Sequence, residues 1–262
     1  VCPISLVYIK RLCGSVGVSK IWKEKMSKWP AKRFWKEVKI KQNGTEFAVL
    51  LDCSPLSTPG KSQVLVPTKE LARQIAAEWA SQEDLVDPLS MPFTRMTNTA
   101  IDKVSLQAAE VVQHLTAYAE TDHLCYRADC PPVLVQRQVE SWDPLLDWAK
   151  DTFNAPLNKA IGVIYVDQPI ESILRLKRRI TRLSAFELAA VHDLICLSGS
   201  FVAALAVIYK KKPAKEIWEL CRIDETWQIE QWGKDTEEEA TTKQKMADFL
   251  HAASYFSVLA YT

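Results

Sequence analysis

Glycine is scarce in this sequence, with seven glycines among 262 residues. Loops that cradle a phosphate or a dinucleotide need closely spaced glycines, because the backbone must approach the ligand. The motifs GxGxxG, GxxxxGKS/T, HExxH and GxSxG are all absent. These absences disfavour nucleotide-binding folds, metallopeptidases of the HExxH type and α/β-hydrolases.

The sequence also lacks an excess of one charge and a long apolar run. The formal net charge is +1, so the overall field predicts no nucleic-acid partner. The longest apolar run, Leu194–Tyr209, is interrupted by Ser198–Ser200 and followed by three lysines. It is shorter than the roughly 20 residues that cross a bilayer. We therefore predict a buried core helix there and no membrane span.

The seven cysteines are odd in number, scattered and without a CxxC pair. This pattern is typical neither of a disulfide framework nor of a structural metal site. We predict reduced thiols, no bound metal and no cofactor. Reduced thiols indicate a reducing compartment, either a cytosol or a mitochondrial matrix.

Residues suited to proton transfer are few and well separated. The best acid–base pair is His192–Asp193, but neighbouring residues on a helix point about 100° apart. We therefore expect Asp193 not to orient the His192 ring, and His192 to be structural. His123 and Cys125 stand two residues apart, a spacing that a helix does not bring together. We predict no catalytic residue; an enzyme that uses His192 with Asp193 or Glu225 remains an alternative.

Residues 1–31 form a basic extension with one acidic residue, Glu24. A basic leader with serines is compatible with organelle targeting. The simpler interpretation is a solvated extension of the folded chain.

Residues 32–103 are predicted to form a small N-terminal α+β unit. Residues 34–40 and 46–52 alternate between apolar and polar, and the Asn43-Gly44 pair between them indicates a hairpin. A third strand over residues 63–66 completes an antiparallel meander.

A helix is expected to cover the meander. Thr68 is a candidate N-cap, and Leu71, Ile75 and Trp79 then recur at helical spacing. Trp79 is therefore assigned to the core. Pro92 opens a segment that is either an ordered crossover or another helix, and we assign it a structural role.

Residues 104–262 are predicted to form a larger all-helical domain, which makes the whole an α+β fold. The exception is the run Gly162–Val166, which is predicted to form a short strand. Trp142 is assigned to packing. The expected helices cover residues 105–119, 132–152, 170–182, 185–209, 213–233 and 237–255.

A cluster of basic residues lies on one of these helices, at Arg175, Lys177, Arg178, Arg179 and Arg182. Its mixed spacing predicts side chains spread around solvated outer faces. Binding of an anion or a nucleic acid is the alternative.

The stretch Arg222–Gly233 is the strongest candidate for a functional surface. It holds two tryptophans, three carboxylates and two amides in twelve residues, and it resembles neither a metal site nor a nucleophile site. Such a surface is typical of a protein that binds another protein. Gly233 is expected to close the helix, and the tryptophans are assigned to either core or surface. The candidate partner-binding residues are Asp224, Glu225, Trp227, Gln228, Glu230, Gln231 and Trp232.

Several ordered blocks of sequence resemble the ATP12 family, the assembly chaperones of the F1 sector of ATP synthase. The resemblance extends from about residue 32 to about residue 260, and it depends on the order and spacing of the blocks. One departure is Cys53-Ser54-Pro55, where the family commonly has a Gly-Arg pair. The blocks are residues 32–36, 51–52, 56–59, 76–82, 91–95, 98–102, 122 with 124–127, 142–148, 192–194 and 197–200.

The resemblance implies a non-enzymatic protein that binds the free F1 α subunit transiently and covers its β-facing surface until assembly. It implies that an acidic residue at the position of Asp224 matters, with Glu225 beside it. The tryptophan at Trp227 resembles α-proteobacterial members, which implies a bacterial cytoplasm, with the mitochondrial matrix as the alternative. A protein-interaction module with another client remains open. We expect a monomer when the protein is free.

Overall fold

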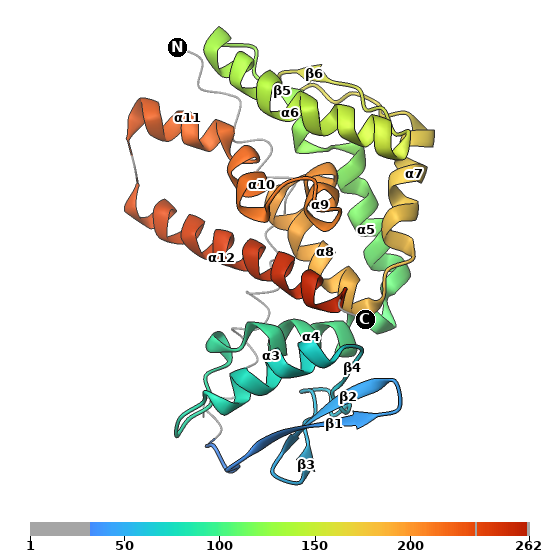
Figure 1. Ribbon diagram of the computed structural model, residues 1–262. Helices are drawn as coiled ribbons and strands as arrows, with labels where there is room; N and C mark the ends of the chain where they lie inside the picture. The colour runs from blue at the N-terminus through green and yellow to red at the C-terminus, as the bar shows by residue number, and fades with distance from the viewer. Residues whose placement is uncertain (1–31, 234, 261–262) are drawn as a thin grey trace.

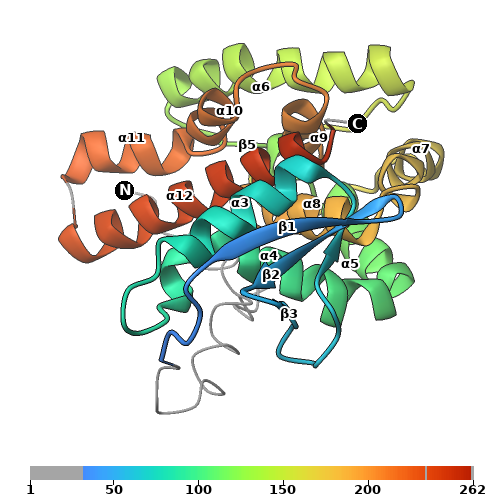
Figure 2. The ribbon, with the colours of Figure 1, turned by 60° about the horizontal axis from the view of Figure 1, so that its bottom comes forward.

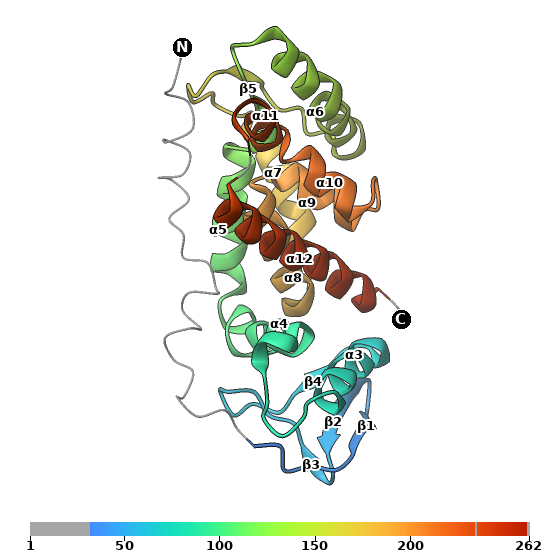
Figure 3. The ribbon, with the colours of Figure 1, turned by 90° about the vertical axis from the view of Figure 1, so that its left-hand side faces the viewer.

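The computed structural model describes residues 32–233 and 235–260. The predicted extension over residues 1–31 lies outside these residues. The described chain is α+β, with a small sheet at one end and a larger group of helices above it (Figure 1). In a perpendicular view the sheet and its covering helices occupy one end of an elongated molecule, and α6 the other (Figure 3).

The sheet is built around β2 (Glu46–Leu51), which pairs on one edge with β1 (Val38–Asn43). The hairpin turns at Gly44, whose φ of +63° suits a residue without a Cβ. The other edge of β2 pairs with β3 (Ser54–Pro55) and β4 (Leu65–Val66), both antiparallel. The predicted meander is confirmed, and the Cys53–Pro55 segment adds the short strand β3.

Helix α3 (Lys69–Ala80) packs over this sheet (Figure 2). Thr68 caps it, because its hydroxyl oxygen accepts from the Leu71 amide at 3.2 Å. Trp79 is half-buried and meets the ring of the buried Trp35 edge-on at 5.0 Å. Pro92 is the first residue of α4 (Pro92–Asp102), where a missing N–H costs nothing.

The remaining elements form the helical part of the molecule. Strands β5 (Tyr126–Arg127) and β6 (Ala160–Ile161) pair to form a two-stranded parallel sheet. Short 3-10 turns lie at Pro88–Ser90, Val104–Leu106 and His123–Cys125. The helices are α5 (Ala108–Glu120), α6 (Pro132–Phe153), α7 (Ile170–Thr181), α8 (Ala185–Ser198), α9 (Phe201–Ile208), α10 (Ala214–Leu220), α11 (Ile223–Trp232) and α12 (Thr236–Leu259).

One continuous apolar core joins the two parts of the chain. Helix α8 is central to it and packs against α12, α4 and α5. The Thr68 hydroxyl also donates to the Val258 carbonyl at 2.9 Å, which ties the start of α3 to the end of α12. The division at residue 103 stays a prediction, since α4 packs on α8 as well as on α3. Within the described ranges, no helix has both the length and the apolar character that a membrane crossing requires.

Four predicted elements differ from the structure. The first strand lies at Val38–Asn43 rather than over residues 34–40. The helix expected over residues 185–209 is two helices, because Gly199 ends α8 with a φ of +68°. The helix expected over residues 213–233 is also two, α10 and α11. The strand expected at Gly162–Val166 is wrong: none of these residues is in a strand, and β6 lies just before them at Ala160–Ile161, where Gly162 turns the chain with a φ of +75°.

Gly199→Ala is expected to lower the free energy of unfolding by about 1–2 kcal/mol, the cost of a left-handed conformation for a residue with a Cβ. An added Cβ would lie 3.7 Å from the Cβ of His123, an ordinary contact, so the loss comes from the backbone. Gly199→Asn is the matched control, because asparagine tolerates this conformation better. Urea unfolding measures both variants, and an alanine variant as stable as the wild type would contradict this account of the helix break.

Candidate functional site

Every side chain of α11 keeps part of its surface in solvent. The helix lies at the edge of the molecule, between α6 and the start of α12 (Figure 1). A helix without a buried face is held by polar contacts and by its neighbours rather than by an apolar stripe. Its contacts therefore decide which of its residues are available to a partner.

Asp224 holds α11 against α6. Its carboxylate accepts a hydrogen bond of 2.6 Å from the Gln138 side-chain amide. Gln138 is itself buried, and its carbonyl oxygen accepts from the Ala128 amide at 2.8 Å. Both ends of the Gln138 amide are thus used, which fixes its orientation. Asp224 is half-buried and positions the first turn of α11.

Arg137, one residue earlier on α6, contacts the outer half of α11. It forms an ion pair of 2.7 Å with Glu230. Its guanidinium also lies 4.9 Å from the centre of the Trp227 ring, a cation–π geometry. Trp227 is half-buried, so it belongs neither to the core nor to the fully exposed surface.

Arg222 organises the other side of the helix, at the junction of α10 and α11. It pairs with Glu225 at 3.5 Å and donates to the Thr242 hydroxyl of α12 at 3.2 Å. Its guanidinium also lies 5.4 Å from the centre of the Trp218 ring. One buried oxygen of Glu225 has no hydrogen-bond partner among the described residues.

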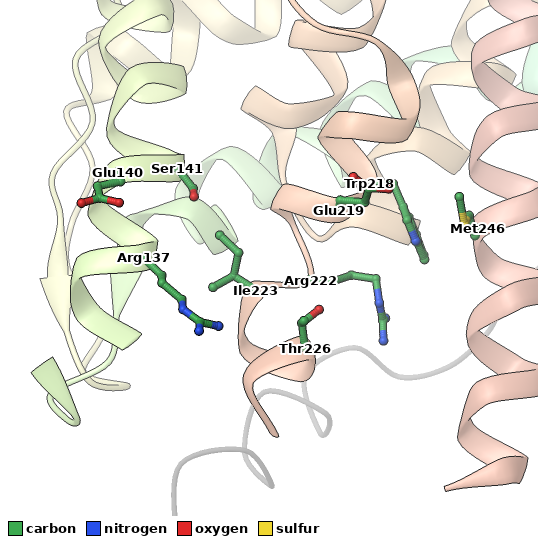
Figure 4. Close-up of a pocket in the computed structure, with 9 residues that line it drawn as sticks. All are labelled: Arg137, Glu140, Ser141, Trp218, Glu219, Arg222, Ile223, Thr226 and Met246. Atoms are coloured by element: carbon green, nitrogen blue, oxygen red, sulfur yellow. The ribbon is translucent and has the colours of Figure 1, made fainter. Parts of the chain in front are cut away.

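A groove of about 500 Å³ runs beside these contacts, between α6, α10, α11 and α12 (Figure 4). Arg137 and Ser141 line it from α6, and Ile223 and Thr226 from α11. Trp218 from α10 and Met246 from α12 line it on the side opposite Arg137. Mixed apolar and charged walls of this kind suit a peptide segment better than a small polar substrate.

The far end of α11 presents a large apolar side chain to solvent. Trp232 is 79% exposed, and Ile229 is 36% exposed. Gln231 and Glu230 are exposed between and beside them. Gly233 ends the helix with a φ of 87°, as expected for a closing glycine. An exposed tryptophan next to amide and carboxylate groups is the composition of a protein-binding hot spot.

The seven predicted partner-binding residues thus lie on one short helix. Four of them are half-buried, and the last three, Glu230, Gln231 and Trp232, are exposed. Sequence reasoning missed Gln138 and Arg137, which anchor the helix from a distant part of the chain. The signal for them was weak, since two polar residues on α6 look like any solvated pair.

His192 lies on α8, away from this surface and outside the groove of Figure 4. The expectation that Asp193 does not orient its ring is wrong, because Nδ1 donates to the Asp193 carboxylate at 3.0 Å. Burial opposes protonation, yet hydrogen bonds to Asp193 and Cys196 raise the pKa of His192 to about 10. Glu225 belongs to the Arg222 cluster on α11, so it is not a partner of this histidine.

The pair His123 and Cys125 is not a reactive site. Cys125 is buried, and burial raises the pKa of its thiol well above the usual range. The five cysteines of the described residues form no disulfide. The buried Asp122 beside them serves as a cap, accepting from the Leu124 and Val202 amides at 2.9 Å.

The predicted spread of the basic cluster is wrong for its arginines. Arg175, Arg178, Arg179 and Arg182 line one groove of about 430 Å³ with Tyr209. Two of the four have partners inside the protein, since Arg175 donates to the Asn154 carbonyl and Arg179 lies over the Phe153 ring. These contacts favour a structural role over nucleic-acid binding.

The exposed helix, its polar anchors and the adjacent groove together form the candidate site on an α+β scaffold. Residues 32–150 match the family described as ATP12 chaperone protein. The structure of Atp12 from Paracoccus denitrificans is similar, with 43% identity, a TM-score of 0.85, and 87% of this chain and 98% of that one covered. The chain belongs to the ATP12 chaperone family.

Two further structures are similar to this one. An aspartate-to-lysine mutant of P. denitrificans Atp12p is 42% identical, with a TM-score of 0.86 and coverage of 89% of this chain and 100% of that one. A candidate chaperone from Agrobacterium tumefaciens is 36% identical, with a TM-score of 0.81 and coverage of 87% and 85%. The likeness therefore extends over nearly the whole described chain.

Proposed function

We propose that the protein is an assembly chaperone of the F1 sector of ATP synthase that binds the free F1 α subunit. It covers the surface of that subunit which later meets the β subunit. The observation that carries the proposal is α11: a helix with no buried face that ends in the exposed Trp232, on a scaffold of the ATP12 family.

The physical task explains the composition of this surface. A subunit awaiting its permanent partner exposes a large apolar interface and aggregates. A temporary partner has to bury that interface and still release it. A few aromatic anchors with a polar and acidic rim provide contact energy at the centre and charge-dependent selection at the edge.

The α11 residues take different parts in this proposal. Trp232 and Gln231 contact the client directly, and Glu230 contributes charge while its pair with Arg137 keeps it in place. Asp224, Glu225, Trp227 and Gln228 form the half-buried base of the site.

The remaining expectations extend the same proposal. The protein acts as a monomer when free, without catalysis, metal or cofactor in its chaperone cycle. It works in a bacterial cytoplasm, with a mitochondrial matrix as the alternative compartment. A protein-interaction module with a different client is the competing hypothesis, and the client test separates the two.

Asp224→Lys and Glu225→Lys are expected to lower the affinity for isolated F1 α subunit about tenfold or more. Asp224→Lys removes the carboxylate that accepts from Gln138, and Glu225→Lys places a cation beside Arg222; each change breaks a contact that positions the helix. Co-purification followed by equilibrium titration measures the effect, with isolated F1 β subunit as the comparison client.

The control is Asp151→Lys, an equal charge change at an exposed site in the last turn of α6, where a cation suits the helix end. We expect it to bind as the wild type does. A wild-type chain that ignores α and binds other proteins would overturn the client. Normal binding by both charge reversals would overturn the site and leave the client standing.

A further inference from the structure

Three potential metal ligands lie close together between α5 and α8, two helices that are distant from α11 in the sequence. His114 comes from α5, and His192 and Cys196 come from α8. A spacing of four residues places His192 and Cys196 on the same face of their helix. The nitrogen and sulfur atoms that could bind a metal all lie within 4.8 Å of one another.

The distances suit a tetrahedral ion. Cys196 Sγ lies 3.7 Å from His192 Nε2. Two such ligands on one zinc ion, at their usual bond lengths and the tetrahedral angle, are separated by about 3.6 Å. The His114 ring faces the His192 ring at 6.4 Å between centroids and 28° between planes. His114 is exposed, so its ring can rotate to complete the set.

A carboxylate already orients the His192 ring. The Nδ1–H of His192 donates to Asp193 at 3.0 Å, which leaves Nε2 facing Cys196. Histidines that bind metals are commonly oriented by a carboxylate on their other ring nitrogen. The adjacent Asp193, which has no part in the α11 surface, acquires a role in this arrangement.

We propose that His114, His192 and Cys196 form a binding site for one divalent transition-metal ion, of which Zn²⁺ is the natural probe. Two imidazole nitrogens and a thiolate are the donors that borderline-soft ions prefer. A water molecule occupies the fourth position on the exposed His114 side. The bound ion links α5 to α8. The site is independent of client binding by α11.

Metal binding displaces the protons that the free ligands hold. The Cys196 thiol gives up its proton, and the imidazolium of His192 loses the one on Nε2. The ion thus replaces a histidine–cysteine contact within α8 by a bridge between α5 and α8. We expect excess Zn²⁺ to raise the melting temperature, because it binds the folded chain preferentially.

The test uses the untagged full chain, stripped of metal with a chelator and then titrated with Co²⁺ and with Zn²⁺. Tetrahedral Co²⁺ is expected to show d–d bands and a thiolate-to-cobalt charge-transfer band. Zn²⁺ affinity is read by competition with a chromophoric chelator. Cys196→Ser should lose the charge-transfer band and the zinc-dependent rise in melting temperature. Asp193→Asn should weaken zinc binding about 10–100-fold.

Cys53→Ser is the matched control, an exposed cysteine in the N-terminal part of the chain, and it should keep the band and the affinity. His114→Ala changes an exposed residue and should fold normally by circular dichroism while weakening zinc binding at least tenfold. A wild-type chain without the charge-transfer band would overturn the proposal. So would a Cys196→Ser or His114→Ala variant that binds zinc as tightly as the wild type.

Discussion

Trp142→Ala is expected to lower the free energy of unfolding by about 3–5 kcal/mol, the usual cost of truncating a buried aromatic residue to alanine. Trp142 is fully buried, and its ring meets His123 at 5.0 Å between centroids. The guanidinium of Arg127 lies 4.9 Å from the centre of the Trp142 ring. Removing the indole leaves a cavity in the core. It also takes the aromatic ring away from the buried guanidinium of Arg127.

The indole also fixes the junction that leads into α11. Its Nε1–H donates to the Leu220 carbonyl at 2.7 Å, at the last residue of α10. This bond is part-buried, and a carbonyl that loses its donor there costs up to about 1–3 kcal/mol. We therefore expect Trp142→Ala to loosen the start of α11 as well as the core below it.

Urea unfolding of the wild type, Trp142→Phe and Trp142→Ala separates the stability lost with the buried ring from the stability lost with the hydrogen bond to Leu220. Phenylalanine keeps most of the buried ring and removes only the donor. Trp142→Phe should therefore lower the free energy of unfolding by less than Trp142→Ala does. Hydrogen exchange at the α11 amides should increase in both variants, because both lack the bond to Leu220. Unchanged exchange in α11 would show that this bond does not hold the junction.

Much of the fold follows from short-range patterns in the sequence. The hairpin is marked by Asn43-Gly44 between alternating residues, and the start of α3 by Thr68 with its apolar spacing. These signals involve neighbours in the chain, so a local pattern is sufficient to predict them. The two missed helix breaks were harder, since only the three residues Ser198–Ser200 mark the first, in an otherwise apolar run.

Long-range capping is where sequence reasoning fails. Glu78 on α3 accepts from the Phe93 and Thr94 amides at 2.6 and 2.7 Å and thereby caps the start of α4. Burial raises the pKa of this carboxyl, which the Thr94 and Phe93 donors partly offset. Nothing near Pro92 in sequence indicates a cap fifteen residues earlier, because helix packing alone brings the two together.

The candidate site shows the same division. Its location on residues 222–233 follows from local composition, since two tryptophans and three carboxylates stand in twelve residues. Its anchoring does not, because Gln138 and Asp224 are 86 residues apart and Arg137 and Glu230 are 93 apart. The acidic start of the helix therefore has a positioning role that composition could not reveal, and the exposed end carries the free aromatic surface.

Trp232→Ala is expected to weaken binding of the F1 α subunit by about 30-fold or more, the loss typical of an aromatic hot spot. The side chain is 79% exposed and contributes little to the fold, so the free energy of unfolding should change by less than about 0.5 kcal/mol. Binding and stability are thus predicted to separate at this residue. Titration calorimetry with isolated F1 α subunit and urea unfolding measure the two quantities.

Leu106→Ala is the matched control, because Leu106 is also largely exposed, at 77%, but lies far from α11 in the sequence. It should bind the subunit as the wild type does. Trp232→Phe should retain part of the affinity, since an aromatic ring remains for contact without the indole N–H. Equal losses for Leu106→Ala and Trp232→Ala would mean that exposed apolar surface in general, rather than the end of α11, holds the client.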